Sequence, residues 1–306
     1  MAINRAQLVK ELEPGLNALF GLEYKRYADE TTMIFDVEGS DRAFEEEVML
    51  GGFGAAVTKA EGSGVSYDAA AESWTARYQH ETIALAFALT EESIEDNLYE
   101  KLSSRYTKAL ARSMMHTKNV KGAAILNNAF STDYLGGDGK SLIAEGASNG
   151  HPLLNGAVLD NEPTTATDLN ETALENAYIH ISQWTDERGL KIACKPTKLI
   201  IPAALSFVAE RILNSSLRVG TADNDLNALA SKSAIPGGYD TNHYLVDPDA
   251  WFLKTDAPNA LKQFTRVAMK TGMEGDFETG NVRYKARERY SHGWSDYRGI
   301  YGSPGE

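Results

Sequence analysis

The sequence has almost no cysteine and no long apolar run, and each absence excludes a class of protein. Cys194 is the only cysteine among 306 residues, so the chain cannot form an internal disulfide or a zinc site built from several thiolates. No apolar stretch approaches the roughly 20 residues that cross a bilayer, and the N-terminus lacks the apolar core of a signal peptide. We therefore expect a chain that stays in the cytosol of the cell that makes it, with no membrane partner.

Motifs for catalysis and cofactor binding are also missing. The sequence contains no HExxH, GxSxG or GxGxxG pattern. Gly139, Lys140 and Ser141 match the end of a phosphate-binding loop, but the glycine required five positions before Gly139 is Tyr134. The six histidines are scattered, with no pair at metal-ligand spacing. These absences predict a protein that is not an enzyme and that holds neither cofactor nor metal ion.

Acidic residues outnumber basic ones, and the whole surplus lies in the first third. The chain has 43 Asp and Glu against 30 Lys and Arg, a formal net charge of −13. Residues 1–100 hold 20 acidic and 7 basic side chains, whereas residues 101–306 hold 23 of each. Such a chain is a poor candidate for sequence-specific nucleic-acid binding, although a local basic stripe can still face a polyanion.

Residues 1–50 are predicted to form an extended or partly helical arm. The leucines at positions 8, 12, 16 and 19 follow helical spacing, but Pro14 and Gly15 interrupt the pattern. An acidic run that ends in Glu45, Glu46 and Glu47 follows. It is either a solvated face or a surface that docks on a basic partner.

Residues 51–89 are predicted to form a long β-hairpin. Glycines 62 and 64 supply the positive φ that its reversal needs. Apolar residues alternate on the returning strand, and the phase slips near His80, where we expect a bulge or bend. The hairpin has too few large apolar residues for a core of its own, and an isolated hairpin is marginal in water. We therefore expect it to rest on something else, such as another chain.

A helix of thirty or more residues, unusually long for a globular domain, is predicted between Thr90 and about residue 130. Thr90 is a suitable N-cap, and acidic residues follow where the helix dipole favours them. The predicted packing face comprises Leu98, Leu102, Tyr106, Ala109, Ser113, Thr117 and Val120. A basic stripe about 100° further round comprises Lys101, Arg105, Lys108 and Arg112.

A loop-rich stretch leads to a mixed α and β unit over residues 168–260. Asp168 and Glu171 resemble a capping box at the start of a helix, and Pro202 is expected to begin another. Cys194 is expected to be a small buried hydrophobic residue. The expected strands are 191–193, 198–201, 244–246 and 251–253.

Residues 261–306 are predicted to return to strand structure. Side chains of residues 282–290 alternate between two faces, and one face carries Arg283, Lys285, Arg287 and Arg289. Four like charges on one strand face repel each other unless a partner neutralises them. A solvated edge face and a partner surface are both compatible with this row.

This order of parts resembles the major capsid protein of tailed bacteriophages, with the Hong Kong 97-type fold. The stretches that carry the resemblance are ERGLKIACKPTKLIIP (187–202), AERILNSSLRVGTADNDLNAL (209–229) and MEGDFETGNVRYKARERYSHGWSDYRGIYGS (273–303). The resemblance implies an α+β fold with five parts. They are an N-arm (1–50), an E-loop hairpin (51–89), a P-domain with its long spine helix and a following loop (90–167), an A-domain (168–260) and closing P-domain strands (261–306).

The resemblance also implies a structural function in a virion. Copies would assemble in the cytoplasm of a bacterial host into pentamers and hexamers, which form an icosahedral shell around packaged double-stranded DNA. Separate scaffolding, portal and decoration proteins are implied as partners. An encapsulin-like nanocompartment, which encloses a cargo enzyme, is the alternative.

Two sets of residues are expected to make the contacts of such a shell. Contacts between subunits are expected from Glu45, Glu46, Glu47, Lys59, Glu61, Trp74, Arg77, Arg283, Lys285, Arg287 and Arg289. Lys59 is also the local candidate for the lysine–asparagine cross-link of some family members. The basic stripe on the long helix either faces DNA or forms salt bridges within the shell.

Overall fold

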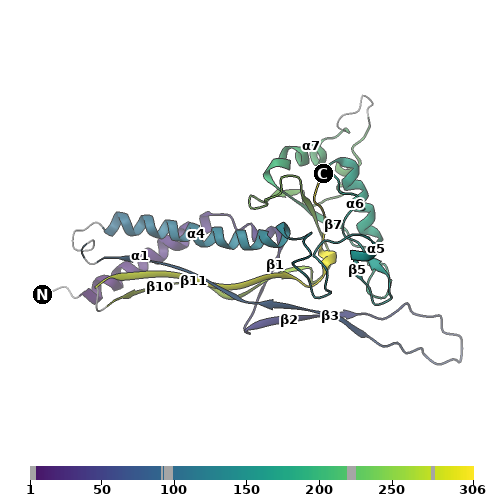
Figure 1. The fold of residues 1–306 in the computed structure, drawn as a ribbon, viewed down its shortest axis with the longest axis horizontal. Coiled ribbons are helices and arrows are strands. Elements are labelled where there is room, and N and C mark those ends of the chain that lie inside the picture. Colours follow the sequence, from purple (N-terminus) through teal and green to yellow (C-terminus); the bar gives the residue numbers. More distant parts are fainter. Residues whose placement is uncertain (1–4, 91, 93–98, 219–224, 277–279) are drawn as a thin grey trace.

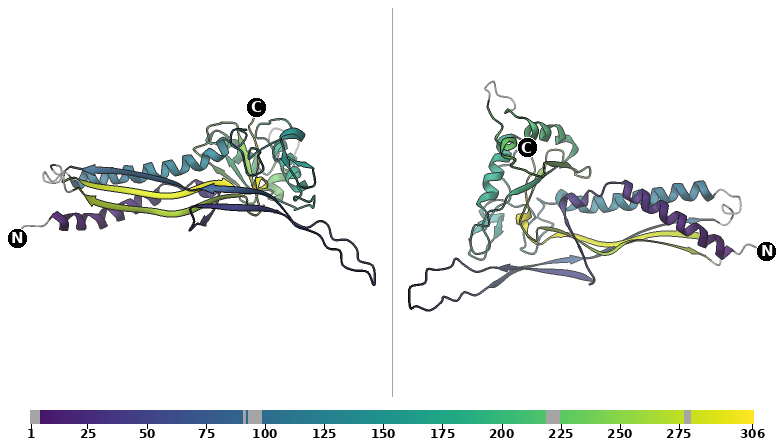
Figure 2. Two further views of the ribbon diagram at one scale, coloured as in Figure 1. Left: turned by 60° about the horizontal axis from the view of Figure 1, so that its bottom comes forward. Right: turned by 180° about the vertical axis from the view of Figure 1, so that it is seen from behind.

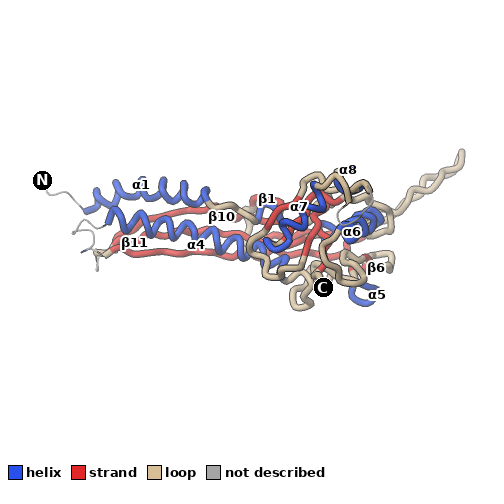
Figure 3. Tube along the Cα trace, turned by 90° about the horizontal axis from the view of Figure 1, so that it is seen from above, coloured by secondary structure: helices blue, strands red, loops and turns tan. Residues whose placement is uncertain are grey.

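The computed structural model describes residues 5–90, 92, 99–218, 225–276 and 280–306. It has three parts (Figure 1): a long layer of helices over a sheet, a compact unit at one end of this layer, and a hairpin arm that projects past the compact unit. Figure 3 shows the start of α1 and the tip of the arm at opposite ends of the molecule. In the described ranges, no helix is both long enough and apolar enough to cross a membrane.

The long layer is built on a four-stranded sheet in the order β1-β10-β11-β4. Its strands are β1 (Asp36–Gly39), β10 (Leu261–Gly275), β11 (Val282–Trp294) and β4 (Glu81–Leu89). The pairs β10–β11 and β11–β4 are antiparallel, and the short β1 runs parallel to β10. The strand predicted over 282–290 is confirmed, because its even-numbered side chains are buried and its odd-numbered ones are exposed or half-buried.

Helices α1 (Arg5–Arg26) and α4 (Tyr99–Asn127) lie side by side on one face of this sheet (Figures 1 and 3). Their shared core contains Leu16, Phe20, Leu110, Met114 and Tyr284. Full burial of a large apolar side chain contributes roughly 1.5–3 kcal/mol. In the part of the chain that the structure describes, no helix covers the opposite face (Figure 2), which we call the open sheet face.

The buried face of α4 lies one residue further along the chain than predicted. Tyr106 and Val120 are 48% and 43% exposed, whereas Thr107 and Leu110 are buried. One residue corresponds to about 100° of rotation. The buried face includes the polar Ser103 and Thr107, which a search for apolar periodicity overlooks. The predicted start after Thr90 falls on residues 91 and 93–98, outside the described residues, as do the side chains of Leu98 and Leu102.

The interruption predicted at Pro14 is wrong, because α1 continues through this residue. Proline removes one helical hydrogen bond and usually kinks or ends a helix. Here residues of the next helical turn contact the sheet beneath the helix. Leu16 is buried, and Asn17 Oδ1 accepts hydrogen bonds from the hydroxyl groups of Thr271 and Tyr284 at 2.7 and 2.9 Å. Tertiary contacts therefore outweigh the local preference.

The compact unit contains a second sheet in the order β12-β9-β7-β8. Its strands are β12 (Ile300–Ser303), β9 (Trp251–Thr255), β7 (Pro196–Ile201) and β8 (Tyr239–Thr241), and its helices are α6 (Glu171–Gln183), α7 (Ser206–Asn214) and α8 (Ala228–Lys232). The short elements of the chain are α2 (Thr31–Ile34), α5 (Gly146–Asn149), β5 (His151–Pro152), β6 (Val158–Leu159), η1 (Ala203–Leu205) and η2 (Tyr297–Gly299). Strand β12 pairs with β9, so the segment 261–306 does not only close the long layer as predicted.

Local predictions for the compact unit are partly confirmed. The strands expected at 198–201 and 251–253 are present, but residues 191–193 contribute only one bridge, between Thr185 and Lys191. The N-cap of α6 is Asn170 instead of Asp168. The strand expected at 244–246 is absent, because the backbone there bonds to the side chain of Asn127 at the end of α4.

The hairpin arm begins and ends earlier than the predicted range 51–89. Strand β2 (Phe44–Gly51) pairs antiparallel with β3 (Ala71–Gln79), and residues 52–70 continue beyond this ladder. The bend predicted near His80 is confirmed, since β3 ends before it and β4 begins after it in the other sheet. The His80 ring contacts two other parts of the chain. Its Nε2 lies 2.9 Å from Ser40 Oγ, and its Nδ1 lies 3.0 Å from Ser291 Oγ.

A buried carboxyl group, Glu288, lies between α1 and the sheet. Tyr24 Oη donates a 3.1 Å hydrogen bond to Glu288 Oε2, while Oε1 has no partner among the described residues. Burial raises the pKa of Glu288 from 4.5 to about 7, against the opposing effect of Lys118. Because the folded state holds this proton more tightly than the unfolded chain, the stabilising contribution of Glu288 is fully present below about pH 4.5 and is lost as the pH rises through 7.

We predict that Glu288→Gln removes most of this pH dependence. The pKa shift of Glu288 should lower the wild-type unfolding free energy by on the order of 2 kcal/mol between about pH 5 and about pH 8. The neutral amide of the variant should abolish this decrease. Denaturant unfolding at both pH values measures the effect. The exposed Glu72→Gln is the control and should retain the wild-type slope. An unchanged slope in Glu288→Gln would contradict the assignment.

Candidate functional site

The four basic residues of β11 form a row on the open sheet face. Arg283, Lys285 and Arg287 are exposed and Arg289 is half-buried. Among the described residues, the only ion pair of this row is that between Arg283 and Asp276. Lys270 of β10 lies opposite Arg287 in the register. Glu274 of β10 lies opposite Arg283. Among the described residues, the row therefore carries more positive charge than its ion pair neutralises.

A flat edge runs beside this row. Ala84, Ala86 and Ala88 of β4 are exposed and lie opposite Arg287, Lys285 and Arg283. Alanine methyl groups do not rise above the basic side chains, so an extended segment can lie along β4 within reach of the row. β4 is also an edge strand of its sheet, which leaves backbone groups available to a further chain.

Part of the acidic surplus of the first third is paired inside the chain. Carboxylates from residues 23–81 contact basic side chains from residues 108–262. The pairs are Glu23–Lys108, Asp29–Lys118, Glu30–His243, Asp36–Lys254, Glu38–Lys262, Glu47–Lys262, Asp68–Arg188 and Glu81–Lys121. Burial works against the charge of Lys262, but the hydrogen bonds that it donates to Glu47 and Glu38 raise its pKa. These pairs therefore attach the first third to its own body and account for part of the charge asymmetry.

The predicted acidic run on β2 divides between two environments. Glu47 points inward, where Lys262 donates to it at 2.5 Å and Ser295 also bonds to it. Glu45 accepts a 2.7 Å hydrogen bond from Ser40. Glu46 is exposed and lies 3.7 Å from Arg77, so it is the member of the run that remains on the surface.

Trp74 and Arg77 of β3 also have partners within the chain. Trp74 packs against Tyr297 with ring centroids 5.7 Å apart, and its Nε1 donates a 3.1 Å hydrogen bond to the Ser295 carbonyl. Arg77 covers the Phe44 ring at 4.1 Å. Trp74 therefore anchors the arm to its own body, while Arg77 remains on the exposed side of the arm.

The structure adds an apolar stripe on the arm that sequence reasoning missed. Phe44, Val48 and Leu50 alternate along the exposed side of β2 at 38%, 45% and 64% exposure. Further along the arm, exposed large apolar side chains are Phe53, Val57, Val65 and Tyr67. The alternation was present in FEEEVML but was masked by the acidic run. Lys59 and Glu61 lie exposed near the tip.

The basic stripe of α4 faces away from the sheet. Arg105, Lys108 and Arg112 are exposed, whereas the side chain of Lys101 lies outside the described residues. Lys108 lies 3.4 Å from Glu23 of α1. The layer therefore carries positive side chains on both of its surfaces, those of β11 on the open sheet face and those of α4 on the helix side.

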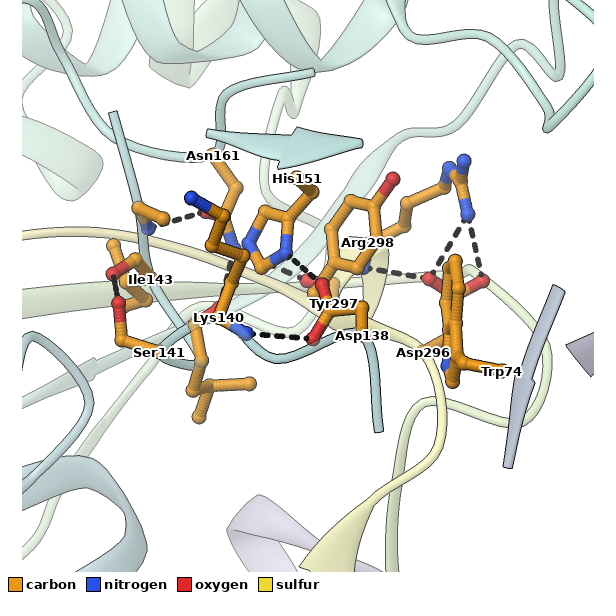
Figure 4. A network of polar contacts seen from close by, with 12 residues as sticks. Trp74, Asp138, Lys140, Ser141, Ile143, His151, Asn161, Asp296, Tyr297 and Arg298 are labelled. Carbon is orange, nitrogen blue, oxygen red and sulfur yellow. Dashed lines mark hydrogen bonds and ion pairs between the residues drawn. The ribbon is translucent and has the colours of Figure 1, made fainter. Parts of the chain in front are cut away.

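The glycine-rich loop of residues 136–156 forms part of a buried polar junction. His151 Nδ1 lies 2.5 Å from Asp138 Oδ2, and its ring stacks flat on Tyr297 at a centroid distance of 3.6 Å (Figure 4). The Asn161 side chain donates to the carbonyl groups of Leu142, Tyr297 and Ile300. This loop therefore fastens the last strand to the rest of the chain.

Arg298 is the centre of the same junction. It is 1% exposed, and its guanidinium contacts Glu187 at 2.7 Å and Asp296 at 3.2 Å. Nε donates a 3.0 Å hydrogen bond to the Thr185 carbonyl. A buried charge needs such complete pairing.

The described residues offer little for catalysis. Cys194 is buried, and burial raises its thiol pKa to about 11, which disfavours the reactive thiolate. In the ranges that the structure describes, no group of three or more His, Cys, Asp or Glu side chains is placed to hold a metal ion.

We predict that Arg298→Met destabilises the fold strongly. The change leaves Glu187 and Asp296 buried without their counter-charge, and losing one member of a buried ion pair typically costs about 3–5 kcal/mol. Arg77→Ala removes an exposed arginine and should cost about 1 kcal/mol or less. Denaturant unfolding of both variants provides the comparison, and equal losses would contradict a central role for Arg298.

Comparisons with known proteins agree with this fold. The family described as phage capsid protein matches residues 72–303. No curated protein sequence matches. The capsid of Myoviridae phage XM1 is similar over 89% of both chains, with 12% identity and a TM-score of 0.53.

Two further structures are similar over most of their length. The capsid of a native GTA particle matches 90% of this chain and 89% of its own, with 14% identity and a TM-score of 0.52. A virus-like particle from Pyrococcus furiosus matches 94% and 97%, with 12% identity and a TM-score of 0.51. At these identities the likeness establishes the fold, and it confirms the predicted resemblance to tailed-phage capsids. The chain belongs to the phage capsid protein family.

Proposed function

We propose that this chain is a major capsid protein whose copies form pentamers and hexamers of an icosahedral shell around double-stranded DNA. The observation that carries the proposal is the hairpin arm. It projects beyond the body with an exposed apolar stripe and no core of its own (Figure 2). Exposed apolar surface of this kind is typical of an interaction site, and a second copy is the partner that a shell supplies.

The parts of the shell subunit correspond to parts of this fold. The long layer takes the role of the P-domain with α4 as its spine helix, the compact unit that of the A-domain, and the arm that of the E-loop. The arm of one copy would lie across the long layer of the next. Its tip and base carry Glu61 and Glu72, exposed acids without an ion pair in the described structure.

The basic row supplies the complementary surface. Arg283 to Arg289 lie on the open sheet face beside the flat edge of β4, so an arm from a neighbouring copy finds both positive charge and room for an extended segment. Exposed ion pairs contribute at most about 1 kcal/mol each. Their main effect is to fix the register and speed of association, and the shell repeats them at every contact.

The helix side is the surface of the layer opposite the open sheet face. If the open sheet face receives a neighbour, the exposed Arg105 and Arg112 on α4 point to the other side of the shell wall. Basic side chains there attract phosphate groups without regard to sequence. We assign this side to the packaged DNA. Lys108 contributes less, because Glu23 already partly neutralises it.

We predict that reversing two charges of the basic row blocks assembly. The wild-type chain should elute from size exclusion as megadalton particles, whereas Arg283→Glu with Arg287→Glu should leave mainly small species, since the row would then repel the acidic arm. Electron microscopy checks particle integrity. Unchanged assembly with unchanged salt dependence would refute docking on this face.

The matched pair Arg105→Glu with Arg112→Glu should behave differently. It reverses the same number of charges on the helix side, so we predict closed particles that hold less nucleic acid, by at least twofold in the ratio of absorbance at 260 nm to that at 280 nm after nuclease treatment and high-salt washing. Equal nucleic-acid content in wild type and variant would remove the DNA assignment.

An encapsulin-like compartment that encloses a cargo enzyme is the second candidate. The match to the virus-like particle from Pyrococcus furiosus, which covers 94% of this chain, favours it. The nucleic-acid content of purified wild-type particles separates the candidates. Absorbance dominated by nucleic acid supports the capsid, and protein-filled particles support the compartment.

A further inference from the structure

Arg188 connects the outer part of the hairpin arm, beyond the anchor at Trp74, to the compact unit. The backbone ladder of the arm ends at the pair Gly51–Ala71. Directly beyond it, Arg188 Nε donates a 3.2 Å hydrogen bond to the Gly52 carbonyl, and Nη2 donates a 2.5 Å bond to the Ala69 carbonyl. These carbonyl groups belong to opposite strands of the arm. One guanidinium therefore bridges both strands where their own pairing stops.

Asp68 completes this bridge from within the arm. Its Oδ2 accepts a 2.7 Å hydrogen bond from the Gly54 amide across the arm, and Oδ1 accepts one from the Ala69 amide at 2.8 Å. Arg188 Nη2 approaches Oδ1 at 3.4 Å. These bonds hold the two strands together for several residues beyond the ladder.

The turn that carries Arg188 is itself firmly held. Asp186 Oδ1 accepts hydrogen bonds from the amides of Arg188 and Leu190 at 2.9 and 2.8 Å. The intervening Glu187 is 1% exposed and paired with Arg298. Neighbouring side chains of this turn thus point in opposite directions, Glu187 into the buried junction and Arg188 onto the base of the arm.

We infer that Arg188 is a positioning residue that sets the direction in which the arm leaves its subunit. A planar guanidinium with donors on separate nitrogens fixes two carbonyl groups at once, which a single point charge does less well. The stripe from Phe44 to Leu50 and the acids of the arm are then presented in one orientation. The consequence for the shell rests on the proposed function, in which this arm covers a neighbouring copy.

A distance measurement on the full chain tests the inference. Spin labels at Ser63→Cys on the arm and Ile179→Cys on α6, in a Cys194→Ala background, report the spread of arm directions by double electron–electron resonance. The measurement uses concentrations at which the chain elutes as a monomer, so it does not depend on assembly. Arg188→Ala and Asp68→Ala are compared with Arg77→Ala, which removes an exposed arginine of the same arm.

The inference predicts a distribution at least twice as wide for Arg188→Ala, a similar broadening for Asp68→Ala, and the wild-type width for Arg77→Ala. Thermal unfolding confirms that each variant is folded. If Arg188→Ala does not fold, Asp68→Ala tests the same bridge. Equal widths in Arg188→Ala and Arg77→Ala would overturn the inference. A broader distribution in Arg188→Ala supports the inference whatever the assembly assay shows. If reversing Arg283 and Arg287 leaves assembly intact, that result refutes only the proposed docking.

Discussion

The structure depends most on the burial of one guanidinium group, that of Arg298. Its two carboxylate partners come from different parts of the chain, Glu187 from the compact unit and Asp296 from the turn after β11. Removing a charge from water is costly unless its pairing is complete. The two ion pairs of Arg298 therefore favour one arrangement of the segments that carry them. Around it Trp74 brings in the arm and His151 the glycine-rich loop. Four segments that are far apart in the sequence thereby meet at one point.

Charge plays two different roles in this molecule. Several acids of the first third contact bases of their own body, such as Asp29 with Lys118 and Glu38 with Lys262. The basic rows of β11 and α4 remain largely free in the described structure. The chain is thus acidic overall but presents positive side chains on both surfaces of its long layer. Under the proposed function, one of these surfaces receives a neighbouring copy and the other faces the interior of the shell.

Much of the fold could be predicted because its signals are local. Period-2 alternation identified β11 and its basic face, and the phase slip identified the bend at His80. The packing face of α4 could not be predicted, because Ser103 and Thr107 are buried against neighbours that an apolar pattern does not reveal. The strand expected at 244–246 failed for a related reason, since Asn127 from a distant helix takes its backbone hydrogen bonds. Arg188 and Arg298 lie within the stretches that carry the family resemblance, yet Arg188 bonds to Gly52 and Ala69, and Arg298 to Glu187, all more than 100 positions away.

By itself, the sequence determined the class of protein, the order of its parts and the faces of its regular strands, because composition, turn residues and short periodicities act between near neighbours. Only the tertiary structure decided which charges are already neutralised, where the arm begins and what holds it. Those properties arise from contacts between distant segments. Glu47 was one acid among several in the sequence, and it became an internal partner of Lys262 only when β2 packed beside β10.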